Sequence, residues 1–554
     1  MGTGKVIIIG GGPVGLGAAL ELSRFGVPSI LIEKHESTSR HPKTRNFNTR
    51  TMEIARGWGQ STYQRLRGID CPPGWKSPIR FLENACGEEF GRIESKGFEG
   101  PGPAVSPAEP TMTSQDRIEE IMLAALRASG LVELRFSTEA VRLVRGGGQE
   151  EDGVEIEIRD RVSGATETIT GCAMVAADGA GSAMRDALGL TLEGQRGVKH
   201  LVNCYFRADI ERHIGERKGV LLFVSNPEAS GVLQPLDANG RWLSQINVMP
   251  EQFSLAYFTK ARAAEWVRAA AGVPDLEVEV LSLGLWELNA TTVDHFVKGR
   301  ALICGDAAHQ FPPTGGLGVN TGLQGMHNAM WKLALYAQGK AGWDLVRTYH
   351  DERRPVSQAI VMQSFINASN VQRINAAAVS GGESGLSAEQ VVAESHRYGN
   401  HLGVEFGSWY RSPAVVPDGS TPERAEDDYS DYVPAATPGC RAPHVWLGQA
   451  GARLSTLDLC GPSFTLLVGP DGEAWEQEVE EARRALGLPI ACYRIGSAGL
   501  QDEGGFLSAF GLEPDGAVLV RPDAHIAWRA QSRVDAAPAL ADALADILQR
   551  KAAA

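Results

Sequence analysis

The chain has 554 residues and a formal net charge of −14, because 67 acidic side chains outnumber 53 basic ones. This length exceeds that of one typical domain, and the acidic balance excludes nucleic acid and anionic membranes as expected partners. No apolar run approaches the ~18 residues of a membrane span, and the first apolar strand begins too early to follow a signal peptide. We therefore expect a cytoplasmic protein. Eight scattered cysteines without a CxxC pair predict neither disulfides nor a metal site.

The amino terminus has the pattern of a dinucleotide-binding βαβ unit. Residues 5–9 read as a buried parallel strand, a glycine-rich turn from Gly10 to Gly15 follows, and residues 16–25 have helical periodicity. A second strand ends in Glu33, eighteen positions after Gly15, where an acidic side chain binds a ribose hydroxyl. Strand, glycines, helix and terminal acid together predict a bound dinucleotide.

Two later segments point to the same edge of that sheet. Residues 173–177 form a strand-like run that ends at Asp178, and residues 300–304 form another that ends at Gly305-Asp306. Ligands bind at the carboxyl ends of such strands, so Asp306 can accept a hydrogen bond from a ligand hydroxyl. Pro312-Pro313 and three glycines then lead into a helix near Asn320, whose N–H groups and dipole favour a ring that becomes anionic.

With motifs at 10–15, 178–185 and 304–322 in this order, the chain resembles the class A flavoprotein monooxygenases, the family of para-hydroxybenzoate hydroxylase and phenol hydroxylase. The resemblance covers about the first 370 residues. Two groups in the family are similar, the chlorophenol hydroxylases and the hydroxylases of aromatic polyketides. Residues 87–93, 410–416 and 520–529 resemble the first group, but they do not separate the two.

The resemblance implies an α/β fold: a Rossmann-like FAD-binding domain with an inserted antiparallel substrate-binding sheet, and a carboxyl-terminal thioredoxin-like domain without CxxC. We expect the FAD-binding domain at 1–76, 105–197 and 285–371, and the substrate-binding sheet at 77–104 and 198–284. A helix and an exposed linker are expected at 372–432, and the thioredoxin-like domain at 433–554. We expect that last domain to be structural, in a homodimer or as a cover for the first domain.

By the same resemblance the cofactors are FAD, NADPH or NADH as reductant, and O2 as co-substrate. No second dinucleotide fingerprint follows residue 15, which fits a nicotinamide that visits the flavin without a domain of its own. Arg45 is expected near a phosphate, with Arg50 as the alternative, and Gln115 matches a flavin-contacting glutamine. The implied cofactor-binding residues are Gly10, Gly12, Pro13, Val14, Gly15, Glu33, Lys34, Arg45, Gln115, Asp178, Asp306, Pro313, Gly316, Leu317, Gly318, Val319 and Asn320.

The implied reaction is hydroxylation of a small phenolic or polycyclic aromatic substrate through a C4a-hydroperoxyflavin, with Pro313 beside the substrate. No carboxylate occupies the position where the catalytic base of the family would be expected. The polar candidates in the sheet are Asn203, Tyr205, Gln234, Ser244 and Gln245, and of these Tyr205 and Gln234 are the catalytic candidates. One alternative is Baeyer–Villiger oxygen insertion, and another is a non-catalytic flavin-binding interaction protein. A flavin-dependent halogenase is disfavoured, because residues 241–247 lack its WxWxIP segment.

Overall fold

The computed structural model describes residues 4–148, 152–237, 239–380, 386–497, 499–536 and 538–549. Its amino-terminal part is built on a six-stranded sheet with the order β17-β18-β11-β1-β2-β7, and the five strands from β18 to β7 are parallel. The strands are β1 Val6–Ile9, β2 Ser29–Ile32, β7 Val132–Arg135, β11 Ala173–Ala176, β17 Val297–Lys298 and β18 Ala301–Ile303. Four of these strands, β1, β2, β11 and β18, are fully buried, as expected for a parallel sheet covered on both faces.

The helices that cover this sheet share one apolar core with it. α1 packs against both α5 and α9, and α9 packs in turn against α2 and α10. The bounds of these helices are α1 Pro13–Arg24, α2 Thr49–Arg56, α3 Gln60–Gly68, α5 Gln115–Ser129, α9 Gly318–Ala337 and α10 Trp343–Ser380. No described helix combines the length and apolar character needed to span a bilayer.

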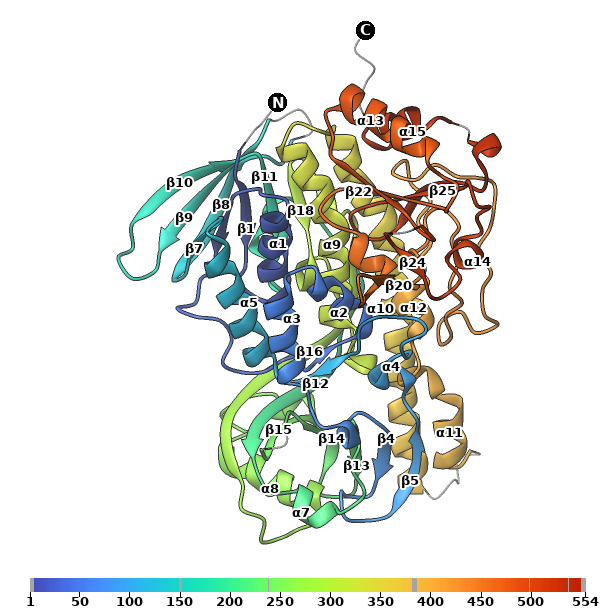
Figure 1. Ribbon diagram of the computed structural model, residues 1–554. Helices are drawn as coiled ribbons and strands as arrows, with labels where there is room; N and C mark the ends of the chain where they lie inside the picture. The colour runs from blue at the N-terminus through green and yellow to red at the C-terminus, as the bar shows by residue number, and fades with distance from the viewer. Residues whose placement is uncertain are drawn as a thin grey trace.

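A second, eight-stranded sheet lies below the first in Figure 1, in the order β19-β16-β12-β15-β14-β13-β4-β5. All neighbours are antiparallel except the pair β4 and β13. Its strands are β4 Ile79–Leu82, β5 Glu89–Ile93, β12 Leu192–Arg207, β13 Leu221–Ser225, β14 Ser230–Pro235, β15 Arg241–Val248, β16 Glu279–Val293 and β19 His309–Gln310. Because β19 belongs to the 304–322 motif, the sheet is hydrogen-bonded directly to that motif.

Side-chain alternation divides the eight-stranded sheet into two faces. On β12, Val202, Cys204 and Phe206 enter an apolar core together with α8 Lys260–Ala271. Since alternate residues of a strand point to opposite sides, the odd-numbered positions face the other way. We call this second side, which bears Leu201 and its cross-strand partner Asn247, the substrate face.

The carboxyl-terminal part contains a four-stranded sheet in the order β23-β22-β25-β26, with β22 and β23 parallel and the other neighbours antiparallel. A βαβ unit followed by a hairpin and a helix in this strand order is thioredoxin-like. Its elements are β22 Phe464–Val468, α13 Ala474–Leu486, β23 Ile490–Arg494, α14 Phe506–Phe510, β25 Ala517–Val520, β26 Ile526–Ala530 and α15 Leu540–Ile547. Trp331 of α9 stacks edge-on against Phe464, so this part is packed on the helices of the first (Figure 1).

The remaining elements connect or extend these three bodies. A three-stranded antiparallel sheet projects from the first domain (Figure 1), and short strands and helices lie along the connections. They are β3 Asn46–Phe47, α4 Lys96–Glu99, β6 Thr111–Met112, β8 Thr138–Arg145, β9 Val154–Asp160, β10 Thr166–Gly171, α6 Ala183–Ala187, α7 Glu211–Ile214, α11 Ala388–Glu394, α12 Leu402–Phe406, β20 Trp446–Gln449, β21 Ala452–Ser455 and β24 Gln501–Asp502.

The segment expected to be an exposed linker is exposed only in part. Its acidic stretch at 423–429 is largely exposed, as expected. Tyr410 and Ser430, however, are 3% and 4% exposed, and Arg441 just after the segment is 1% exposed. The polar composition did not reveal this burial, because the Tyr410 hydroxyl accepts a hydrogen bond from Arg353 and Arg441 pairs with Glu53, both of them side chains of the amino-terminal part.

Candidate active site

The first glycine turn leaves one side of its backbone open. Gly10 has φ +108°, and a Cβ there would lie 2.2 Å from the carbonyl oxygen of Ala177. A Cβ on Gly15 would lie 1.9 Å from the carbonyl oxygen of Gly10, whereas a Cβ on Gly12 would meet no atom within 4 Å. Strand and helix thus approach closely through two glycines, and the third presents free space at the start of α1, where a diphosphate fits.

Glu33 is held in a fixed orientation at the end of β2. Its Oε2 accepts a hydrogen bond from Gly11 N at 2.7 Å, and its Oε1 accepts one from His35 N at 2.9 Å. Each oxygen keeps a further lone pair, so the carboxylate can still accept ribose hydroxyls. Lys34 lies next to it with an exposed side chain.

The turn before α9 lies against the first glycine loop. A Cβ on Gly305 or Gly322 would lie 3.0 or 2.7 Å from Val14, so the two motifs meet at that side chain. Asp306 is exposed, and its carboxylate forms no hydrogen bond within the described part of the chain. Surrounding protein nevertheless raises its pKa by desolvation. This carboxylate is therefore available to a ligand.

Asn320 fixes the start of α9, which begins at Gly318. Its Oδ1 accepts from Asn48 N at 3.0 Å, and its Nδ2 donates to the carbonyls of Asn46 at 3.0 Å and Gly316 at 2.8 Å. Leu317 and Val319 complete this turn beside Pro313, and Pro13 occupies the first turn of α1. The positive ends of two helices thus flank the same region, which suits an anionic ligand.

Gln115 and Asp178 are largely occupied by contacts within the protein. The Gln115 Oε1 accepts from Lys43 N at 3.2 Å and Thr44 N at 3.1 Å, while its Nε2 donates to Glu119 at 2.6 Å. Asp178 accepts from Ser182 Oγ at 2.5 Å and from Met184 N at 3.2 Å, and so supports the start of α6. Both side chains order backbone segments that border the cradle.

The phosphate contact expected for Arg45 stays a prediction, and within the protein the Arg45 side chain is hydrogen-bonded to three other residues. Its buried guanidinium donates to Gln234 Oε1 and Pro235 O, each at 3.0 Å, and to Val220 O. Burial lowers its pKa to about 10. Gln234 and Pro235 belong to β14, and Val220 directly precedes β13, so the geometry favours a role beside the eight-stranded sheet. The alternative, Arg50, is also buried and pairs with Glu53 at 2.8 Å.

A pocket opens between the substrate face and the 304–322 motif. Pro313 and Thr314 form one wall, and the opposite wall comes from the sheet. The sheet contributes mostly apolar side chains together with Lys199, Gln245 and Asn247, and α10 and Tyr398 close the side. No carboxylate lines the pocket, and burial lowers the pKa of Lys199.

The structure separates the two sequence-derived catalytic candidates from this pocket. Tyr205 lies on the substrate face, but its hydroxyl accepts a hydrogen bond from Arg241 at 3.1 Å, and Gln234 is bonded to Arg45. Ser244 points to the opposite face, whereas Gln245 lines the pocket. Sequence reasoning missed Lys199 and Tyr398. Alternation from Leu201 would have indicated the first; nothing local in the sequence marked the second.

The motifs, the open glycine cradle and the adjoining pocket define a flavin-dependent aromatic monooxygenase, and comparisons with known proteins identify the same class. A family model described as FAD binding domain matches residues 3–364, and one described as aromatic-ring hydroxylase, C-terminal matches residues 435–550. The chain therefore belongs to the FAD-dependent aromatic-ring hydroxylases, and it binds FAD.

Curated relatives and a solved structure are similar to this chain over nearly its whole length. Tetracenomycin A2 monooxygenase-dioxygenase of Streptomyces glaucescens is 34% identical, with 98% of this chain and 97% of the relative covered. The 4-methyl-5-nitrocatechol 5-monooxygenase of a Burkholderia species is also 34% identical, with the same coverage. The solved flavin-dependent monooxygenase PieE, in complex with FAD and substrate, is 33% identical with a TM-score of 0.91 over 99% of both chains.

Proposed function

We propose that the enzyme hydroxylates an electron-rich phenolic ring, in a simple phenol or a polycyclic aromatic, inside the pocket beside Pro313. One observation carries this proposal: Pro313 and Thr314, from the motif of the cofactor cradle, line the same pocket as the substrate face of the sheet. A substrate bound there would lie next to the cofactor. The relatives described above are named for tetracenomycin A2 and for 4-methyl-5-nitrocatechol, and the carboxyl-terminal family model is that of aromatic-ring hydroxylases, which supports an aromatic substrate.

The cofactor contacts in this proposal follow the geometry of the cradle. Backbone groups at Gly12 would bind the diphosphate, Glu33 the adenosine ribose and Asp306 the ribityl chain. The start of α9 would stabilise negative charge on the flavin ring. Bound FAD, reduced by a nicotinamide, supplies the oxygen activation that no amino-acid side chain offers.

The pocket can favour an ionised phenol without a general base. Phenols ordinarily titrate near pKa ~10, and a nearby cation stabilises the phenolate. The ammonium group of Lys199 has no hydrogen bond or ion pair with other described residues, and an anionic substrate would supply the partner that this half-buried group lacks. Lys199 would thus orient the ring and hold its charge, while Pro313 and the apolar wall exclude water.

The test is a panel of phenols, chlorophenols and anthraquinone-like compounds, scored by NADPH and NADH consumption against hydroxylated product. Coupled consumption and hydroxylation support the proposal. Ester or lactone products would identify Baeyer–Villiger insertion, and retained FAD without substrate-stimulated consumption would identify a non-catalytic flavin protein. NADPH as the preferred reductant, a homodimer and a cytoplasmic location stay predictions; parallel NADH assays, sedimentation and cell fractionation test them.

A further inference from the structure

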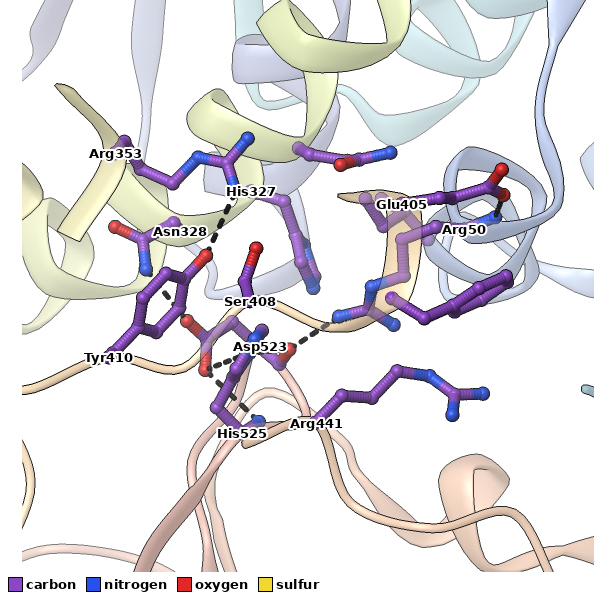
Figure 2. Close-up of a pocket in the computed structure, with 13 residues that line it drawn as sticks. Arg50, His327, Asn328, Arg353, Glu405, Ser408, Tyr410, Arg441, Asp523 and His525 are labelled. Carbon is purple, nitrogen blue, oxygen red and sulfur yellow. Dashed lines mark hydrogen bonds and ion pairs between the residues drawn. The ribbon is translucent and has the colours of Figure 1, made fainter. Parts of the chain in front are cut away.

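A second, polar cavity lies between the FAD-binding part and the carboxyl-terminal part (Figure 2). α2, α9 and α10 line one side of it, and residues 405–410, 441 and 523–525 line the other. Apart from Arg50, the alternative to Arg45 in the sequence prediction, none of the residues assigned above to the FAD cradle or the substrate pocket borders it. It is therefore a separate site.

Three buried arginines surround this cavity. Arg50, Arg353 and Arg441 are 5%, 3% and 1% exposed, respectively. Arg50 and Arg441 share one carboxylate, that of Glu53, through contacts of 2.8 Å and 3.0 Å. The single negative charge of Glu53 is thus shared by two positively charged guanidinium groups.

The other carboxylates at the cavity do not supply the missing charge. Asp523 is paired with the buried Arg521, whose Nε donates to Oδ1 at 3.0 Å. Glu405 accepts from Arg50 N at 2.8 Å, but burial raises its pKa and so favours its neutral form. The local charge of the cavity is therefore positive.

Arg353 is the arginine that lacks a counterion. Its Nη1 donates to Tyr410 Oη at 3.0 Å, and no carboxylate of a described residue lies within ion-pair distance. Its Nε and Nη2 are buried without any hydrogen-bond partner, and so is Nη1 of Arg441. Figure 2 shows the Arg353 guanidinium directed toward the space between Asn328, Tyr410 and His327. A buried charge without a partner is strongly unfavourable, and its donors require an acceptor.

We propose that this cavity binds a small monovalent anion of the size of chloride. The free space accommodates about one species of the size of a water molecule, which excludes phosphate esters and nucleotides. The anion would accept hydrogen bonds from Arg353 and neutralise the excess positive charge. Since the cavity walls come from both parts of the chain, anion binding would strengthen the docking of the carboxyl-terminal part.

The test compares thermal unfolding of the FAD-loaded enzyme in sodium chloride and in sodium gluconate, at constant ionic strength. A bound anion stabilises the folded state by mass action, so we expect a saturable rise of about 2 °C or more with chloride. Arg353→Met should abolish that rise. Arg347→Met is the matched control, because Arg347 lies on the same helix in an exposed pair with Asp344 and should keep it.

Crystals of the wild-type holoenzyme grown with bromide give a direct readout that does not depend on a variant's folding. An anomalous peak within hydrogen-bond distance of Arg353, at bromide concentrations that also shift the unfolding midpoint, supports the proposal. Water or empty density at that place overturns it. Equal midpoints in chloride and gluconate, or a full chloride effect in Arg353→Met, overturn it as well.

Discussion

Gly12 and Gly15 of the cofactor cradle exclude a side chain for different reasons. A Cβ on Gly15 would overlap the backbone of Gly10, and a change there would break the fold itself. A Cβ on Gly12 would meet no protein atom within 4 Å and would occupy space that the cofactor needs. The two glycines thus separate a requirement of the fold from a requirement of the ligand.

We expect Gly12→Ala to fold normally and to bind FAD at least about tenfold more weakly, because the methyl group excludes the close approach of the diphosphate. Bound flavin per chain, measured by absorbance after gel filtration, checks this result. Gly68→Ala is the control, since a Cβ at Gly68 also meets nothing within 4 Å but lies at the end of α3. Unchanged FAD affinity in Gly12→Ala would contradict the assigned cradle.

Lys199 is the one basic side chain among the described residues that line the pocket. We expect Lys199→Met to raise the KM of acidic phenols about tenfold, or about 1.4 kcal/mol, because the phenolate loses a charged partner. The KM of substrates that stay neutral should change less than about twofold. Lys5→Met, which removes an exposed lysine paired with Glu133, is the control. Equal effects on both substrate classes would assign Lys199 a packing role.

The alternation of side chains along a strand determines which polar residues face the substrate pocket. Ser244 and Gln245 are neighbours on β15, yet one is buried against the core face and the other lines the pocket. We expect Gln245→Ala to raise KM several-fold with little change in the unfolding midpoint. Ser244→Ala should leave KM unchanged. Steady-state kinetics of the two variants checks which side of β15 faces the pocket. A raised KM in Ser244→Ala with an unchanged KM in Gln245→Ala would mean that the two faces are interchanged.

Local motifs made much of this fold predictable. The glycines, Glu33 and Asp306 lie within or next to the strands that position them, so their spacing in the sequence already carries the geometry. The contacts of Arg45 were not predictable, because its acceptors, Gln234, Pro235 and Val220, come from a distant part of the chain whose strand register the sequence does not reveal. Tyr398 reaches the pocket only through tertiary packing, and no short motif marks such a residue.

At the junction of the amino- and carboxyl-terminal parts, buried ion pairs lie beside the apolar contact of Trp331 with Phe464. Arg441 binds Glu53 of α2, and Arg521 binds Glu352 of α10 at 2.7 Å and 2.9 Å. Lys332 donates to the same Glu352 carboxylate at 2.7 Å. Such pairs add little net stability over apolar packing, but removing one partner leaves an uncompensated buried charge that costs about 3–5 kcal/mol. The docking of the two parts should therefore depend on the ionisation of these carboxylates.

Acid should weaken that docking in a defined pH window. Burial alone would raise the pKa of Glu53, but Arg441 and Arg50 outweigh it and lower the pKa to about 2 from its ordinary value of 4.5. A lowered folded-state pKa means that the stability from this pair is present above pH 4.5 and is lost as pH falls toward 2. Glu53→Gln should lower the unfolding free energy by about 3 kcal/mol at pH 7.

The difference between wild type and Glu53→Gln should then shrink as the pH falls through that window, because protonation makes the two side chains alike. Urea unfolding of the FAD-loaded enzymes at several pH values measures it. Glu133→Gln, which breaks an exposed pair, is the control and should cost less than about 1 kcal/mol. If the cost of Glu53→Gln stayed constant down to the acid limit, the ion pair would not be what joins α2 to the carboxyl-terminal part.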